Sequence, residues 1–342
     1  MTSTAERLVS PAVLRAAVPA PDPEGVAGQR AAIAAVLDGR DRRLLVVVGP
    51  CSVHDPDAGT EYARRLAAHA RTVEADLLVV MRAYLEKPRT VVGWTGMVND
   101  PGLDGSGDLD AGLSTARRFL AGASAAGVPL AYEFVDPMLA GYLSDLVSWG
   151  AIGARTVQSQ PHRLLASALP MPVGFKNPTS GDVRGAVQAV QAAGSGHVFP
   201  AMGDDGEPTV VRSGGNPHGH VILRGGDATG PNYDADSVGR ALDLLDAAGL
   251  PRRVVVDASH GNSGKDHHRQ RVVLADLAGQ VAGGSAGIAG VMVESFLEAG
   301  AQPIDNLPLV YGRSVTDACL GWSDTEEVLD DLARAARARR LS

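Results

Sequence analysis

The sequence contains one set of side chains whose types suit a metal ion. The set combines a thiol, an imidazole and two carboxylates, supplied by Cys51, His260, Glu294 and Asp317. Such a mixture of donors suits a borderline divalent metal such as Mn, Fe, Co or Zn. Because these residues lie far apart in the chain, a second interpretation stays open, in which Cys51 is a buried core residue and Asp317 caps a helix.

A second set of side chains is cationic. It consists of Arg82, Lys87, Arg89, Arg155, Lys176 and Arg224. Six cations around one site repel one another unless an anion with two or more charges lies among them, and guanidinium groups match phosphate and carboxylate oxygens. We therefore expect phosphorylated acids or sugars as substrates. For any one of these residues taken alone, a solvated position in a loop is the simpler interpretation.

Eight short apolar runs alternate with Ala-rich segments of helical periodicity. The runs, each an expected strand, are 44–49, 77–82, 130–135, 152–156, 173–177, 221–225, 254–260 and 291–295. This alternation predicts the α/β class and a (β/α)8 TIM barrel, in which the polar residues at the strand ends form one site. An open doubly wound sheet is the alternative, but no Gly-rich fingerprint follows the first strand, and Pro50 stands where a phosphate-binding helix would begin.

The chain is expected to divide into an N-terminal extension, residues 1–43, and a barrel catalytic domain, residues 44–342. Within the extension we expect a linker at 18–25 and a helix over 28–40. Two apolar runs at about 197–213, separated by GDDGEP, predict a β-hairpin inserted between strands five and six.

Composition excludes several functional classes. The net charge is −8 and no domain-sized block is basic, so nucleic acid is not an expected partner. No apolar run approaches the roughly 20 residues that cross a bilayer, and the N-terminus lacks a signal-peptide pattern. We expect a cytoplasmic protein with no membrane partner. Cys51 and Cys319 are too few for a disulfide framework.

Nine segments, in order from about residue 30 to 340, resemble the class I 3-deoxy-D-arabino-heptulosonate 7-phosphate (DAHP) synthases. They are GPCSVHD (49–55), MRAYLEKPRTVVGWTG (81–96), NDP (99–101), WGAIGARTVQSQ (149–160), VGFKN (173–177), ILRGG (222–226), DASHGNSGK (257–265), GVMVES (290–295) and SVTDACLGW (314–322). The resemblance implies a metal-dependent transferase that condenses phosphoenolpyruvate with erythrose 4-phosphate and releases phosphate. That reaction opens the shikimate pathway to chorismate and the aromatic amino acids.

The resemblance also implies a role for each residue. The metal ligands would be Cys51, His260, Glu294 and Asp317, and the phosphoenolpyruvate site would contain Arg82, Glu133, Arg155, Lys176 and Arg224. The KPRT segment, with Lys87, Arg89 and Thr90, would hold the aldose phosphate. Lys87, Glu133 and His260 are the expected catalytic residues, with Lys87 supplying a proton and Glu133 orienting a water molecule. A homo-oligomer, either dimer or tetramer, is expected.

Two other functions remain as alternatives. The first is the sister synthase that joins phosphoenolpyruvate to arabinose 5-phosphate, whose relatives carry KANR where this chain has KPRT at 87–90. The second is a non-catalytic sugar-phosphate sensor or a scaffold for a chorismate-processing enzyme. The intact ligand positions and Lys87 argue against that second function.

The hairpin bears on feedback control. The resemblance implies an aromatic amino acid effector bound at this hairpin, where a polar hydroxyl is usual. Here Pro200 and Ala201 occupy that place, and Pro170 replaces another small polar residue. Each lost hydrogen bond to a buried charged group weakens binding by about tenfold or more. We expect weak or no inhibition by phenylalanine or tyrosine, with tryptophan or a pathway product left as the effector.

Overall fold

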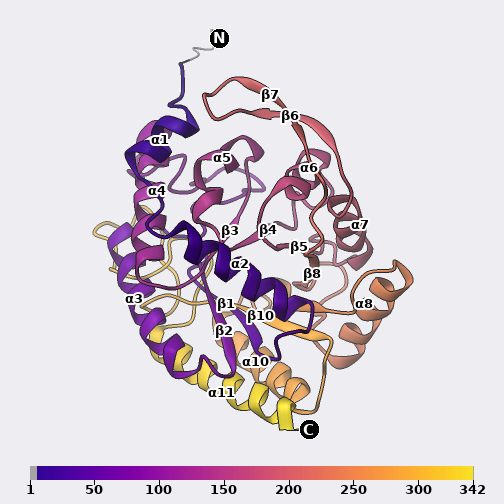
Figure 1. Cartoon of the computed structure of the whole chain (residues 1–342). Coiled ribbons are helices and arrows are strands. Elements are labelled where there is room, and N and C mark those ends of the chain that lie inside the picture. The colour runs from indigo at the N-terminus through magenta and orange to yellow at the C-terminus, as the bar shows by residue number, and fades with distance from the viewer. Residues whose placement is uncertain (1–5, 342) are drawn as a thin grey trace.

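Eight parallel strands close into a barrel in a computed structural model that describes residues 6–341 (Figure 1). Around the barrel their order is β1-β10-β9-β8-β5-β4-β3-β2. The barrel strands are β1 Leu44–Gly49, β2 Leu77–Arg82, β3 Leu130–Glu133, β4 Trp149–Ile152, β5 Val173–Lys176, β8 Gly219–Leu223, β9 Val254–Asp257 and β10 Ile288–Glu294. The predicted (β/α)8 barrel is confirmed.

Helices surround the strands and connect them. They are α1 Pro11–Ala17, α2 Pro23–Leu37, α3 Pro56–Thr72, α4 Leu109–Ala125, α5 Ala140–Leu143, α6 Gln160–Ala168, α7 Val183–Ala193, α8 Ala235–Ala247, α9 His260–Ser263, α10 His267–Ala282 and α11 Trp322–Leu341, with short 3-10 helices η1 Pro137–Leu139 and η2 Ser144–Leu146. Aspartate side chains cap the first turns of many of them, as Asp55 does for α3 and Asp234 for α8. A carboxylate there accepts otherwise unpaired amide donors and favours the positive end of the helix dipole.

The register of the strands aligns their C-terminal ends. Every residue of β1 is buried, as expected for a parallel strand covered on both faces. Gly49 at its end pairs with Glu294 of β10, and Val48 pairs with Met81 of β2. A Cβ on Gly49 would lie 2.7 Å from the carbonyl oxygen of Arg82, so only glycine allows this close approach.

Several predicted boundaries shift in the structure, two of them for a clear local reason. The fourth strand is Trp149–Ile152, not 152–156, because residues 153–157 form a turn in which Thr156 and Val157 donate their amides to the carbonyl of Gly153. The expected linker at 18–25 is also shorter than predicted. Pro23 opens α2 as its first residue, and the side chain of Asp22 accepts the amide of Gly25.

Helix α2 closes the end of the barrel at which the strands begin. Its side chains Ile33, Val36 and Leu37 are buried in one cluster with the barrel interior, including Leu45 of β1 and Trp149 of β4. In Figure 1 this helix crosses in front of the strands. The N-terminal segment therefore contributes to the core of the barrel as well as preceding it.

The predicted hairpin is present between β5 and β8. Strands β6 Val198–Met202 and β7 Pro208–Arg212 pair antiparallel and lie outside the barrel sheet. The N-terminal helix α1 contacts the hairpin tip, where Ala12 donates its amide to the carbonyl of Asp204 and Arg15 pairs with the Asp204 carboxylate at 2.7 Å. Within residues 6–341, none of the helices has the length and apolarity that crossing a membrane requires.

Candidate active site

The strand ends gather charged side chains around one cavity of about 260 Å³. Arg82, Glu133 and Lys176 are the last residues of β2, β3 and β5. Arg224 follows β8 directly, and His260 follows β9 after two residues. Because parallel strands of a closed barrel end on one rim, residues from distant parts of the sequence meet there.

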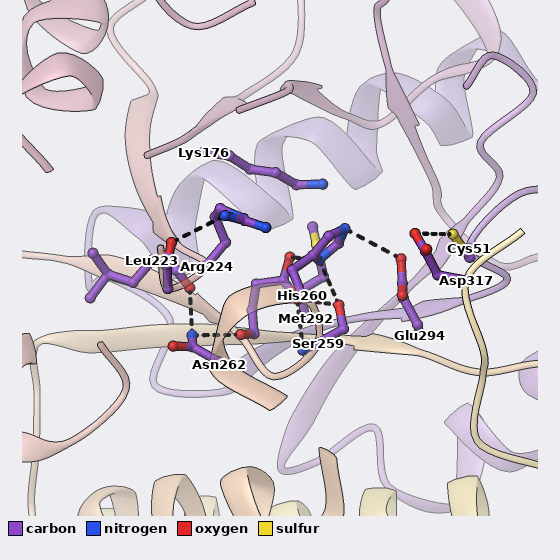
Figure 2. Close-up of polar contacts among 12 residues, drawn as sticks. Cys51, Lys176, Leu223, Arg224, Ser259, His260, Asn262, Met292, Glu294 and Asp317 are labelled. Carbon is purple, nitrogen blue, oxygen red and sulfur yellow. Dashed lines mark hydrogen bonds and ion pairs between the residues drawn. The ribbon is translucent and has the colours of Figure 1, made fainter. Parts of the chain in front are cut away.

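Three of the four predicted metal-ligating residues lie together. Ligand atoms of Cys51, Glu294 and Asp317 are all within 4.8 Å of one another. The Cys51 thiol donates to the Asp317 carboxylate at 3.4 Å. His260 lies beside this cluster, with its Nε2 3.6 Å from Oε1 of Glu294 (Figure 2). A thiol, two carboxylates and a neighbouring imidazole are a donor set that fits a borderline divalent metal.

A buried carboxylate, that of Asp257, orients the ring of His260. Its Nδ1 lies 2.9 Å from Oδ2 of Asp257 and 2.8 Å from the Ser259 hydroxyl. Its backbone φ is 53°, a strained value for a residue other than glycine. Although burial opposes ionisation, the pKa of Asp257 lies well below its usual range because His260 is in contact with it. This arrangement keeps Nε2 directed toward Glu294, as in carboxylate–histidine pairs that orient a metal ligand.

Lys87 lies in the thiol–carboxylate cluster, not among the other cations. Its Nζ is 2.6 Å from Sγ of Cys51 and 3.1 Å from Oδ2 of Asp317. Burial and the nearby Glu294 raise the pKa of Cys51 to about 12, and the charges of Lys87 and Arg82 offset this only in part, so the sulfur is a thiol. Burial opposes the charge on Lys87, yet Cys51 and Asp317 raise its pKa. The position of Lys87 shows that this cluster attracts a cation.

The remaining cations face the cavity from the other side. Lys176 pairs with Glu133 at 2.9 Å. Burial alone would raise the pKa of the Glu133 carboxyl, but the charge of Lys176 outweighs burial and lowers that pKa. Arg224 is buried, and its Nε has no partner within the described chain. In Figure 2, Lys176 and Arg224 lie on the side of His260 away from Cys51. The cavity thus has a cationic half and a half rich in thiol and carboxylate.

Arg82 connects the two halves. It is 1% exposed, pairs with Glu294 at 3.1 Å, and places its guanidinium carbon 4.1 Å from the ring centre of Tyr84. Burial lowers the pKa of Arg82, but Tyr84 and Glu294 reverse this and hold the pKa above its ordinary value. An arginine that is always charged and flanked by an aromatic face suits a fixed anion-binding role.

The KPRT segment forms a loop over the cavity. Its base is closed by the Lys87 amide, which donates to the carbonyl of Thr95 at 2.8 Å. Arg89 donates its Nε to the carbonyl of Trp94, and Arg155 donates to the Thr90 hydroxyl at 2.9 Å. The predicted substrate-binding residues Arg89, Thr90 and Arg155 all line the cavity.

Among the residues of the site that sequence reasoning missed are Tyr84, Glu86 and Asp257. Tyr84 and Glu86 fall within the MRAYLEKPRT segment, and Asp257 begins DASHGNSGK. Their position at or just beyond a strand end was the available signal. Glu86 accepts the hydroxyl of Tyr132 at 2.7 Å and the amide of Asp136 at 3.0 Å. It therefore ties the start of the KPRT loop to the chain after β3.

Fold and site together define a (β/α)8-barrel enzyme with a cationic cavity beside a cluster of metal-type donors. The model of the DAHP synthetase I family matches residues 22–330, and the chain belongs to this family. The reaction is the condensation of phosphoenolpyruvate with erythrose 4-phosphate, the first step of aromatic amino acid biosynthesis. Family membership supports the predicted transferase.

The individual relatives agree with this assignment. The chain is 52% identical to the Trp-sensitive phospho-2-dehydro-3-deoxyheptonate aldolase of Enterobacter agglomerans, over 98% of this chain and 93% of the relative. It is 50% identical to the Phe-sensitive enzyme of Escherichia coli K12, over 92% and 90% of the two chains. A solved structure of the Francisella tularensis SCHU S4 aldolase is 45% identical, with a TM-score of 0.97, and covers 99% of this chain and 100% of that one.

The buried Glu86 leads to a prediction of how the stability of the protein varies with pH. Burial raises its pKa from 4.5 to about 7. The pKa of Glu86 is higher in the folded protein than in the unfolded chain. Its contribution to the free energy of unfolding is therefore complete below about pH 4.5 and is lost as the pH rises through about 7. We expect Glu86→Gln, which keeps an acceptor for Asp136, to flatten this part of the stability curve. Urea unfolding at a series of pH values measures the change.

The matched control is Glu298→Gln, at an exposed position. Its stability curve should run parallel to that of the unmodified protein. If Glu86→Gln also leaves the slope between pH 4.5 and 7 unchanged, Glu86 does not titrate in that interval.

Proposed function

We propose that Cys51, His260, Glu294 and Asp317 bind the divalent metal of this reaction, with Mn, Fe, Co and Zn as the candidate ions. The observation that carries the proposal is the approach of Cys51, Glu294 and Asp317 ligand atoms to within 4.8 Å. The Lys87 ammonium that contacts two of these residues supports it, since a cation is favoured there. When bound, the metal supplies Lewis-acid polarisation of the aldehyde carbonyl.

The cationic half of the cavity is proposed to bind phosphoenolpyruvate. Arg82, Arg155, Lys176 and Arg224 would hold its phosphate and carboxylate. The unpartnered Nε of Arg224 supports this role, because a buried donor without an acceptor is costly until a ligand supplies one. Glu133, ionised against Lys176, would orient the water molecule that adds to C2 of the enol phosphate.

The KPRT loop is proposed to bind erythrose 4-phosphate. Arg89 and Thr90 would contact the phosphate, which leaves the aldehyde end of the sugar directed toward Cys51 and Asp317. Attack by C3 of phosphoenolpyruvate then converts the aldehyde oxygen to an alkoxide, and Lys87 would deliver a proton to it. Lys87 already lies within hydrogen-bond distance of both Cys51 and Asp317, so its ammonium is close to that oxygen.

We also propose a cytoplasmic homo-oligomer, dimer or tetramer, with residues 1–43 as an extension of the 44–342 catalytic domain. Phosphorylated substrates are made and retained inside cells, which supports the location. Val198 and Val210 are 59% and 65% exposed on the hairpin, which supports an interface there, because exposed apolar side chains are commonly buried on assembly.

Tryptophan is the proposed effector. Pro200 and Ala201 of β6 offer no side-chain donor or acceptor, and several relatives are named Trp-sensitive. We expect tryptophan to inhibit turnover, and phenylalanine and tyrosine to act weakly or not at all. Phosphate release measured during titration with each amino acid tests this. Strong inhibition by phenylalanine or tyrosine at micromolar concentration would show that the hairpin binds its effector through other residues.

Lys87→Met tests the proton-donor role. Turnover should fall by about a hundredfold or more, the usual cost of losing a general acid, while phosphoenolpyruvate affinity in calorimetry stays near normal. Lys265→Met is the control, since Lys265 lines the same cavity at an exposed position. Equal loss of phosphoenolpyruvate affinity in Lys87→Met would move this lysine to the other substrate.

Cys51→Ala tests the metal site. Metal affinity should fall by about a hundredfold or more, while circular dichroism and thermal unfolding of the metal-free protein stay close to normal. Metal content after dialysis and turnover in metal-limited buffer are the measurements. Cys319→Ala is the control, because Cys319 is also a buried cysteine but is not part of the Cys51–Glu294–Asp317 cluster. Full metal content in dialysed Cys51→Ala would contradict the proposal.

A further inference from the structure

Three buried asparagines lie next to the cationic half of the catalytic cavity and are joined by hydrogen bonds. Asn177 directly follows β5, Asn232 lies between β8 and α8, and Asn262 belongs to α9. Nδ2 of Asn232 donates to Oδ1 of Asn177 at 3.3 Å, and the backbone amide of Asn232 donates to Oδ1 of Asn262 at 2.7 Å. None of the three is among the residues that line the cavity. We call this group the asparagine triad.

The asparagine triad holds the backbone that carries Arg224. Oδ1 of Asn177 accepts the amide of Arg224 at 2.9 Å, and Oδ1 of Asn232 accepts the amide of Gly225 at 2.7 Å. Gly225 has a φ of 72°, and a Cβ there would lie 2.5 Å from the carbonyl carbon of Gly261. Only glycine allows this close approach between the turn after β8 and the first residues of α9. Two consecutive amides of that turn are thus fixed by side chains.

The triad also determines where the guanidinium group of Arg224 lies. The carbonyl of Gly225 accepts Nδ2 of Asn177 at 2.9 Å and Nη1 of Arg224 at 3.3 Å. Asn177 therefore fixes the acceptor that orients the guanidinium group. With Nη1 held in this way, Nε of Arg224, which has no partner within residues 6–341, remains available to a ligand.

Asn262 connects the same network to His260. Its Nδ2 donates to the carbonyl of Leu223 at 3.2 Å and to that of Asp257 at 2.8 Å (Figure 2). The Asp257 carboxylate in turn contacts the ring of His260, with 2.9 Å between Oδ2 and Nδ1. The triad therefore joins the ends of β5, β8 and β9, and it fixes a cation of the cavity relative to His260.

Every side-chain oxygen and nitrogen of the triad has a hydrogen-bond partner. The three residues are only 0%, 8% and 0% exposed, in the order Asn177, Asn232 and Asn262. A buried polar network in which all groups are paired favours one arrangement of its members, because other arrangements leave donors or acceptors unsatisfied. Such a network restricts the positions that Arg224 can occupy before a ligand arrives.

We propose that Asn177 and Asn232 are positioning residues for phosphoenolpyruvate, and that they act through Arg224. This inference rests on the proposed binding of phosphoenolpyruvate by Arg224. An anion that meets a donor already in place loses less free energy to ordering than one that must immobilise a free side chain. Asn262 extends the same restraint to His260, so that the two proposed sites keep a fixed relative geometry.

Calorimetric titration of the full chain with phosphoenolpyruvate, without the aldose, tests the proposal. Asn232→Ala removes the acceptor of the Gly225 amide and the donor to Asn177. Binding should weaken by about tenfold or more. In turnover assays the KM for phosphoenolpyruvate should rise, while the KM for erythrose 4-phosphate stays near normal. A purely structural role would instead reduce the folded fraction, and with it kcat, at unchanged KM.

A double variant tests whether Asn232 acts through Arg224. If it does, Asn232→Ala combined with Arg224→Ala should bind phosphoenolpyruvate as weakly as Arg224→Ala alone, because the residue to be positioned is already absent. Additive losses would contradict the proposal. Asn177→Ala is the second variant, for use if circular dichroism shows that Asn232→Ala does not fold, and the same results are expected of it.

Asn216→Ala is the matched control. Asn216 is also buried, at 5% exposure, but it precedes β8 and so lies at the opposite end of the barrel. Its Nδ2 donates only to backbone carbonyls, those of Ala166, Leu169 and Met171. Asn216→Ala should lower the temperature of thermal unfolding and leave the affinity for phosphoenolpyruvate unchanged.

The proposed role of Arg224 and that of the triad can fail separately. If Arg224→Ala leaves phosphoenolpyruvate affinity unchanged, the role of Arg224 is wrong and the triad proposal is overturned with it. If Arg224→Ala weakens binding but folded Asn232→Ala and Asn177→Ala do not, only the triad proposal is overturned. An equal loss of affinity in Asn216→Ala would also overturn it, since any buried asparagine would then have the same effect.

Discussion

The ion pair between Arg82 and Glu294 lies inside the barrel, and the catalytic end of the molecule depends on it. The two side chains are 1% and 2% exposed and 3.1 Å apart. A charge that has lost its hydration stays ionised only with an opposite charge in contact, and removal of one partner leaves the other buried and unpaired. Lys176 with Glu133, and Lys87 with Asp317, repeat the arrangement. The rim is thus a set of charge pairs, and substitution of one member leaves its own partner without a counter-charge.

Cys51 shows how this coupling bears on metal binding. Buried beside Glu294 and Asp317, its sulfur has a pKa of about 12 and is a thiol at neutral pH. A thiolate ligand requires a further positive charge nearby, since Lys87 and Arg82 together do not offset burial and two carboxylates. A divalent metal held by Cys51, Glu294 and Asp317 would supply that charge, with loss of the thiol proton, and would weaken the contacts of Lys87 with Cys51 and Asp317. The same exchange would prepare Lys87 to donate a proton at the aldehyde.

Sequence patterns were sufficient for the barrel and for most residues of the rim. Runs such as Leu44–Gly49 and Leu77–Arg82 are continuous and apolar, and their ends are where site residues stand. The fourth strand was displaced in the prediction because Gly150 and Ala151 carry little strand signal. The place of Lys87 depends on closure of its loop at Thr95, a contact that spacing does not reveal.

The two ends of the barrel differ in which helix termini lie there. Each helix runs antiparallel to its strand, so helix N-termini lie at the catalytic end and C-termini lie at the other. The N-terminal dipole ends favour anionic substrates at the rim. At the opposite end, α2 ends at Leu37 and α10 ends at Ala282, and the partial negative charge on their last carbonyls favours cations there. Rim cations and helix N-termini therefore act on an anion from the same end of the barrel, and neither the strands nor the helices place such a combination at the other end.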